Sequence, residues 1–211
     1  TYINAWDAVS AYGSSRMEEE TLLAMREAAT RFVHIEELQK AVGREIAKMT
    51  GNEAAYVVAG TAAGMLMASA VCMVRHPEPE LFAMLPDASE LRNEFILLRE
   101  RKTSVGYAIK AAGGKVIDVA FGQHVTLEDV ERAITPKTCA IVYCDTQVLS
   151  MRCPPLRALT LLAHKHDLFM VVQASGQLPP VENLWHYTVE NGGVLAASVL
   201  CSAVFLREKL K

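Results

Sequence analysis

Short apolar stretches alternate with amphipathic stretches along most of the chain, and this alternation restricts the fold more than any other feature. Strands buried on both faces form such apolar runs, whereas helices repeat their apolar residues every three or four positions. We predict strands at 55–59, 94–99, 116–121, 139–144, 168–172, 194–199 and 203–206. We predict helices at 15–33, 35–49, 64–73, 107–112, 126–134 and 154–166. This order predicts an α/β fold in which helices cover both faces of a mostly parallel sheet.

The 211 residues fit an N-terminal arm with two helices at 1–50, followed by a single α/β unit at 51–211. Ser15 and Glu18 have the spacing of a capping box at the start of the first helix. Thr126 is a typical cap for the helix at 126–134, which has acidic residues in its first turn. No linker, repeat or low-complexity segment divides the α/β part.

Charge and composition disfavour several classes of function. The net charge is -3 and Lys and Arg form no stripe, so a nucleic-acid groove is not indicated. No apolar run is long enough to span a membrane. The five cysteines contain no CxxC pair, and most lie in predicted apolar elements, which favours buried free thiols in a reducing cytoplasm. No spacing typical of metal ligands occurs, so we expect no metal site.

A turn of small residues joins the strand at 55–59 to the helix that follows it. The turn consists of Gly60, Thr61, Ala62 and Ala63. Free backbone N–H groups and the helix dipole would point at one spot there, which favours binding of a phosphate or another anion. The turn is neither a GxGxxG motif nor a P-loop, so no dinucleotide or nucleoside triphosphate is indicated. Close packing of the helix on the strand is the alternative explanation.

A second candidate site follows the strand at 168–172. Gln173 is a polar residue at the carboxyl end of that strand, and Ser175 lies in the small-residue loop after it. In open α/β sheets, ligands bind at the carboxyl ends of strands. Arg101 belongs to a basic cluster after the strand at 94–99, where it would face either solvent or a ligand.

Several motifs, spread over nearly the whole chain, resemble one family. They are INAWDAVSAYGSSRM, VVAGTAAG, RNEFILLR, AIKAAGGKV, KTCAIVY, LAHKHDLFMVV and QLPPVENL. The family is that of the fold type I pyridoxal-phosphate enzymes, in the selenocysteine-synthase-like branch that includes ammonia-lyase-type proteins. The resemblance corresponds to the large, cofactor-binding domain of an aminotransferase-like fold. The smaller C-terminal domain of the family is not contained in the 211 residues.

The resemblance implies roles for particular residues. Gly60, Thr61, Ala62 and Ala63 would hold the cofactor phosphate, and Ser175 would lie nearby. Arg101 stands where the branch usually has the histidine that stacks on the cofactor ring, and a guanidinium is also able to stack. The family forms dimers or larger oligomers with active sites at subunit interfaces. The arm residues Gly13, Ser14, Ser15 and Arg16 would contribute to that interface.

Two positions depart from the family pattern. The aspartate that pairs with the pyridine nitrogen is replaced by Gln173 in the sequence Val172-Gln173-Ala174. The lysine that forms the Schiff base should follow the strand at 194–199. Without a gap its position falls on Ser202, and otherwise the segment carrying it is deleted; the sequence at 203–210 resembles the strand after that segment and favours the deletion.

The leading hypothesis is therefore a degenerate subunit without catalytic residues of its own. It would be inactive as an isolated chain and act as a structural or regulatory partner of a catalytically intact relative. Pyridoxal phosphate would be bound without a covalent bond or not at all. The alternative is an active pyridoxal-phosphate lyase or transferase, acting on an amino acid or amino sugar, whose lysine loop and C-terminal domain lie outside this sequence.

A hydrolase that uses Cys or His is a third class. Cys144 is followed directly by Asp145, and two histidines, His164 and His166, lie two positions apart on a predicted helix. That spacing places the two rings on different faces, and no Ser/His/Asp arrangement accompanies them. This class is the least favoured of the three.

Overall fold

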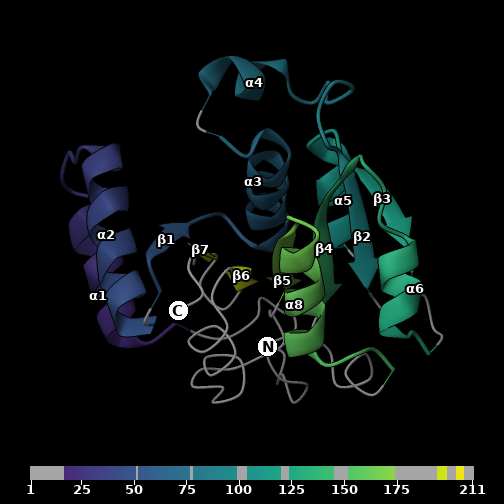
Figure 1. Cartoon of the computed structure of the whole chain (residues 1–211). Coiled ribbons are helices and arrows are strands. Elements are labelled where there is room, and N and C mark those ends of the chain that lie inside the picture. Colours follow the sequence, from purple (N-terminus) through teal and green to yellow (C-terminus); the bar gives the residue numbers. More distant parts are fainter. Residues whose placement is uncertain are drawn as a thin grey trace, which may run out of the picture. The chain divides into compact units, whose positions relative to one another are not determined.

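A computed structural model of the chain describes residues 17–50, 52–76, 78–98, 104–119, 124–144, 152–173, 194–198 and 203–206 (Figure 1). The chain divides into two units, Thr1–Leu38 and Gln39–Lys211. The division falls within one helix, α2 (Ile35–Thr50), whereas the sequence grouped residues 1–50 together.

The described part of the first unit contains α1 (Glu19–Ala28) and the start of α2. The predicted capping box of Ser15 and Glu18 is wrong, because Glu18 occupies the cap position itself and has extended backbone angles. The helix is also shorter than the predicted 15–33. It stops before Thr30, whose hydroxyl donates to the carbonyl oxygen of Glu27 at 2.7 Å and so competes with the helical bonding pattern.

The second unit is built on a seven-stranded sheet with the order β1-β7-β6-β5-β4-β2-β3. Its strands are β1 (Ala54–Val57), β2 (Glu94–Leu98), β3 (Lys115–Asp118), β4 (Thr138–Cys144), β5 (Phe169–Gln173), β6 (Val194–Ser198) and β7 (Ala203–Leu206). Strands β2 to β6 pair in parallel, and only β7 runs antiparallel to its neighbours β6 and β1. The predicted α/β class with a mostly parallel sheet is confirmed.

Helices cover both faces of this sheet. They are α3 (Thr61–Val74), α5 (Ser104–Ala111), α6 (Leu127–Arg132) and α8 (Leu156–Lys165). The short helix α4 (Pro79–Met84) contacts α3 and buries no residue of its own. One core cluster joins α3 and α5 to one face, and another joins α6 and α8 to the face that is turned toward the viewer in Figure 1. Alternate residues of β5 belong to different clusters: Val171 faces α3, whereas Met170 and Val172 face α8.

Strand β1 differs from its prediction as a buried strand at 55–59. It ends at Val57, and its residues alternate between exposed and half-buried, with Tyr56 47% exposed. The reason is its place at the sheet edge, where it pairs with β7 alone among the described strands. Helix α2 approaches β1 so closely that a Cβ on Gly43 would lie 2.2 Å from the carbonyl oxygen of Ala55.

Two negative findings concern the described ranges only. None of the helices in those ranges combines the length and the apolar character needed to cross a membrane. Within the same residues, no group of three His, Cys, Asp or Glu side chains is arranged to hold a metal ion.

Candidate functional site

The turn between β1 and α3 ends at a glycine whose backbone conformation other residues rarely adopt. Gly60 caps α3 with φ 113° and ψ 175°, a region that is essentially restricted to glycine. A Cβ at this position would meet nothing within 4 Å, so the backbone angles and not the available space call for glycine. The first helical bond runs from the N–H of Gly64 to the carbonyl oxygen of Gly60, and no described side chain caps the helix. The amides of the first turn are therefore available to a ligand.

The other end of α3 is anchored to the start of β5. The guanidinium of Arg75 donates to the carboxylate of Asp167 at 2.8 Å and to its carbonyl oxygen at 3.0 Å. The same guanidinium lies 5.2 Å from the ring centroid of Phe169, the first residue of β5. Helix α3 has 14 residues, or about 21 Å at 1.5 Å per residue. It therefore runs along the strands from this anchor, at the start of β5, to their opposite ends. Its first turn therefore lies at the carboxyl end of the parallel strands.

Gln173 lies at the same carboxyl end of the strands as the first turn of α3, and on the same face of the sheet. It is the last residue of β5 and stands two positions after Val171, which packs in the α3 cluster. Because side chains alternate along a strand, the Gln173 side chain points to the α3 side of the sheet. It is 9% exposed. Gln173 and the first turn of α3 therefore border one candidate site.

Cys144 and Ala197 flank Gln173 in the neighbouring strands β4 and β6. Cys144 also belongs to the α3 cluster and is 3% exposed, so its thiol lies beside Gln173 on the site face. From the sequence, Cys144 was considered only as a candidate hydrolase residue, and its position beside Gln173 was not predicted. Its parity in the strand at 139–144 was the available signal, because it matches that of Ala140 and Val142, which face α3.

Six candidate residues from the sequence, and Asp145, lie outside the described residues. They are Gly13, Ser14, Ser15, Arg16, Arg101 and Ser175. Of the predicted site residues, the structure thus brings together Gly60, Thr61, Ala62, Ala63 and Gln173 at one edge of the sheet.

His166 takes part in a contact between two helices, and the thiols of Cys72 and Cys139 are buried. The Nε2 atom of His166 lies 2.8 Å from Glu131, and the Nζ atom of Lys165 lies 2.7 Å from the same oxygen. The bond from Lys165, and to a smaller extent the bond from His166, hold the pKa of Glu131 below its ordinary value. The same two bonds connect α6 to α8. Burial raises the pKa of Cys72 to about 12, although Arg75 acts in the opposite direction, and burial also raises the pKa of Cys139.

Thiol reactivity tests this picture. Since only the thiolate reacts with alkylating reagents, Cys72 and Cys139 should stay unmodified by iodoacetamide at pH 8 in the native protein. Both should be modified fully in about 6 M guanidinium chloride, because only hyperstable domains have unfolding midpoints above roughly 5 M. Peptide mass spectrometry after each treatment provides the measurement. Rapid native modification of Cys72 would show that the interior around α3 opens to solvent.

Comparison with known proteins gives a consistent family. No family model matches the chain. It is 30% identical over 181 residues to a D-glucosaminate-6-phosphate ammonia lyase of Salmonella typhimurium, covering 84% of this chain and 46% of that protein. It is 31% identical over 172 residues to a 5'-C-glycyluridine monooxygenase-decarboxylase of a Streptomyces species, covering 78% of this chain and 43% of that protein. The chain thus spans somewhat less than half the length of these curated relatives.

Solved structures agree on the fold. A D-glucosaminate-6-phosphate ammonia-lyase structure superposes with a TM-score of 0.78 at 24% identity, covering 98% of this chain and 57% of the other. An aspartate aminotransferase of Thermus thermophilus superposes with a TM-score of 0.55 at 19% identity, covering 97% of this chain and 55% of the aminotransferase chain. The fold is thus that of the aminotransferase-like large domain. The chain belongs to the fold type I pyridoxal-phosphate enzymes.

The residues of the site fit one end of pyridoxal phosphate and not the other. The uncapped first turn of α3 suits a phosphate. A covalent bond to the cofactor aldehyde requires a lysine. The connection from β6 to β7 has four residues, Val199, Leu200, Cys201 and Ser202, and none of them is a lysine. Gln173 adds a neutral amide where the family pattern has a carboxylate. Among the residues of the site that the structure describes, the donor set therefore does not fit the covalently bound, ring-protonated cofactor.

Proposed function

We propose that this chain is a catalytically degenerate family member that serves as a structural or regulatory partner of an intact relative in a heteromeric complex. The observation that carries the proposal is the connection between β6 and β7. Ser198 pairs with Ala203 across an antiparallel hairpin, which leaves four residues between the two strands. A segment of the kind that presents a lysine to the cofactor has no room in this connection.

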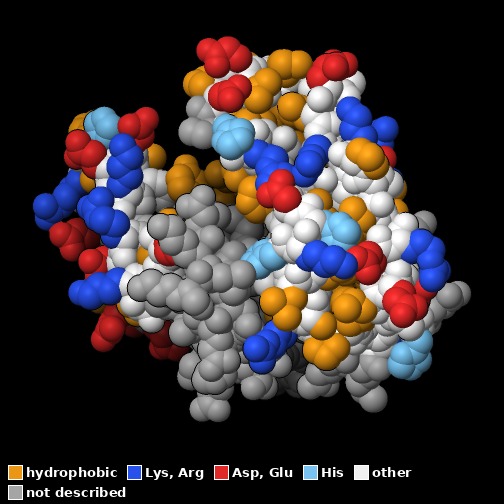
Figure 2. Space-filling model, in the orientation of Figure 1, with side chains coloured by type: hydrophobic (Ala, Val, Ile, Leu, Met, Phe, Trp, Pro, Cys, Tyr) orange, Lys and Arg blue, Asp and Glu red, His pale blue; other side chains and the backbone are white. Residues whose placement is uncertain are grey.

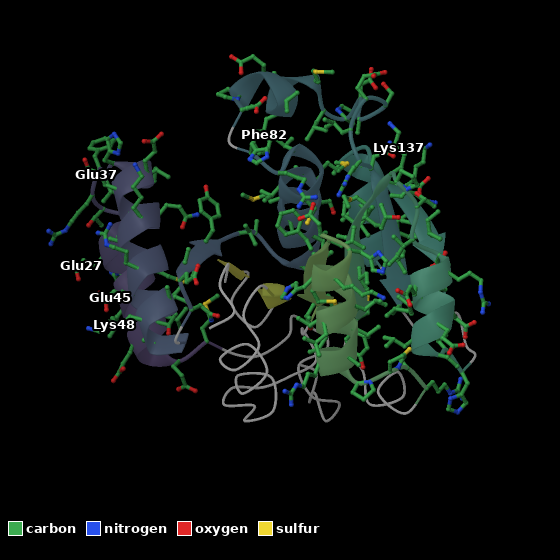
Figure 3. All side chains as sticks on the ribbon, in the orientation of Figure 1. Glu27, Glu37, Glu45, Lys48, Phe82 and Lys137 are labelled. Atoms are coloured by element: carbon green, nitrogen blue, oxygen red, sulfur yellow. The ribbon has the colours of Figure 1, made fainter. Side chains whose placement is uncertain are left out.

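Three of the described lysines lie away from the candidate site. Lys137, labelled in Figure 3, directly precedes β4, and its ammonium group donates to the carbonyl oxygen of Ser89 at 2.9 Å. Lys115 begins β3, and Lys165 ends α8 just before β5. These three therefore lie at the amino ends of the strands, away from the candidate site. Lys102 follows β2 in the sequence but lies outside the described residues, so the experiment below examines it directly.

Exposed apolar surface supports a partner. Helix α3 has no charged residue, and its side chains Leu66, Met67 and Val71 are each more than a third exposed. Apolar side chains also lie at the surface over α4, where Phe82 is 39% exposed (Figure 2). A helix that is apolar all round is normally covered. Proteins of this fold are commonly dimeric. The family resemblance implies in addition that each subunit helps to complete the site of another.

The test is intact-mass spectrometry of the purified protein with any co-purifying chain. The sample is treated with pyridoxal phosphate and then borohydride, which makes a lysine adduct permanent. We expect this chain to keep its 23.1 kDa mass while a second chain gains one pyridoxyl group. Omitting the cofactor is the control for nonspecific reduction.

A pyridoxyl adduct on this chain would contradict the proposal. Peptide mapping would identify the lysine, and a Lys102→Arg variant that loses the adduct would assign it to Lys102. A heavier chain with an adduct would instead support the second candidate, an active pyridoxal-phosphate lyase or transferase. The observation that favours this candidate is that the chain spans less than half the length of its curated relatives.

A further inference from the structure

One face of α2 covers the free edge of β1. The side-chain amide of Gln39 donates to the carbonyl oxygen of Val57 at 2.6 Å, and Gly43 is buried against the carbonyl oxygen of Ala55. Residues four apart on a helix lie on one face, and carbonyl groups two apart on a strand point to one side. Both contacts therefore join one helix face to one row of strand carbonyls. Since β7 pairs with β1 on its other side, α2 lies where a further strand would otherwise pair.

The orientation of α2 is not explained by burial of its large apolar side chains. Val42 is 36% exposed and Met49 is 84% exposed. The buried residues of the helix are the small ones, Gly43 and Ala47. A stripe of small residues lets the helix backbone approach another backbone closely, and a Cβ on Gly43 would lie only 2.2 Å from the Ala55 oxygen. The helix is therefore fitted to the strand edge at the expense of apolar burial.

The two edges of the sheet, among the described strands, differ in how they resist pairing with another chain. At one edge, β3 begins with Lys115 and ends with Asp118, both exposed, and charged side chains discourage such pairing. At the other edge, the four residues of β1 include no charge and no proline, and their pairing with β7 shows no register shift. An edge without these features is a template for strand addition. The protection of β1 therefore depends on α2.

We propose that Gln39 and Gly43 make α2 a cover over a strand-pairing surface, and that β1, once uncovered, pairs with β1 of a second copy of this chain. The second copy is the fitting partner because the edge is uncharged and identical to itself. Two such edges related by a twofold axis run antiparallel, and each offers the other its free N–H and carbonyl groups. The surface is separate from the turn before α3, so this inference does not rest on the proposed function.

The experiment is sedimentation velocity of the protein as purified, together with any partner chain, at about 1 to 100 μM, where exposed strand edges associate. In the Gly43→Ala variant the new Cβ meets a backbone oxygen that has no rotamer with which to move aside, so α2 has to shift away from β1. Arg44→Ala is the matched control, because Arg44 is the exposed next residue of the same helix. Circular dichroism of each variant checks that the fold is kept.

We expect Gly43→Ala to form an additional species of about twice the wild-type mass, in an amount that grows with concentration. Arg44→Ala should keep the wild-type mass. Adding Tyr56→Lys to Gly43→Ala should restore the wild-type mass, because Tyr56 is an exposed residue of β1 and like charges facing each other across paired strands are destabilising. This rescue separates pairing through β1 from unspecific aggregation.

Two results would overturn the inference. One is a Gly43→Ala variant with the wild-type mass and a raised melting temperature, which is the usual effect of this substitution in an unhindered helix. The other is a Gly43→Ala, Tyr56→Lys double variant that associates as strongly as Gly43→Ala alone, because a different surface would then be responsible.

A second variant keeps the question open to decision if Gly43→Ala does not fold. Gln39→Glu has nearly the same size, but it turns a carboxylate toward the carbonyl oxygen of Val57 and removes the donor between them. At pH 7.5 it should form the same species of doubled mass, to a smaller extent, and Tyr56→Lys should again abolish it. A Gln39→Glu variant of wild-type mass at every concentration would contradict the proposed cover.

Discussion

Replacement of Gly113 by alanine is expected to lower the free energy of unfolding by about 3 kcal/mol or more. Gly113 lies between α5 and β3 with φ +101°, a backbone conformation that is strained for every residue other than glycine. A Cβ there would also lie 2.1 Å from the carbonyl oxygen of Pro86 and 2.9 Å from its carbonyl carbon. Because these atoms are backbone, they have no rotamer with which to move aside, so strain and steric overlap add.

Gly60→Ala is the matched control for Gly113→Ala. Gly60 has a similar φ of +113°, but a Cβ on it would meet no atom within 4 Å. Its substitution should therefore cost the backbone strain alone, about 1–2 kcal/mol. Urea unfolding of both variants, followed by circular dichroism, gives the two free energies. Equal losses would show that the loop carrying Pro86 shifts at little cost, contrary to our expectation.

Replacement of Ala62 by aspartate should weaken binding of pyridoxal phosphate at least about 100-fold. Ala62 lies in the exposed first turn of α3, where we propose that the phosphate binds. Two like charges about 4 Å apart near a protein surface repel by about 4 kcal/mol, and about 1.4 kcal/mol corresponds to a tenfold loss of affinity. The same carboxylate should stabilise the helix by about 0.3–1 kcal/mol through its dipole. Affinity and stability should thus change in opposite directions.

Ala62→Asn provides the matched control, because it has nearly the same size as the aspartate variant and no charge. We expect this variant to bind pyridoxal phosphate with an affinity only slightly below that of the wild-type protein. Fluorescence or calorimetric titration at pH 7.5 gives the affinities, and thermal unfolding gives the stabilities. Unchanged affinity in Ala62→Asp would exclude the first turn of α3 as the phosphate site.

Features that depend on neighbouring residues were predictable. Thr126 and Asp129 form a reciprocal capping box at the start of α6: the Thr126 hydroxyl accepts from the amide of Asp129 at 3.2 Å, and the Asp129 carboxylate accepts from the amide of Thr126 at 3.0 Å. The partners are three positions apart, so their spacing indicates the contact directly. Ser15 and Glu18 have the same spacing, yet α1 begins at Glu19. A local pattern permits a cap without placing the helix end.

Features that depend on distant residues were not predictable. The anchor of α3 joins Arg75 to Asp167, which lie 92 positions apart. The edge position of β1 follows from its antiparallel pairing with β7 near the other end of the chain. A run of apolar residues looks the same in a central strand and in an edge strand, so the prediction of a buried β1 was wrong.

The sequence alone determined which residues are present at the candidate site: Gln173 after Val172, four residues without a lysine between the last two strands, and a small-residue turn before α3. It also determined the α/β class, because the order of apolar and amphipathic stretches is a local property. The tertiary structure decided the strand order, the reversal of β7 and the face on which Gln173 lies. These arise from hydrogen bonds and packing between segments far apart in the chain, whose pairing no local spacing specifies.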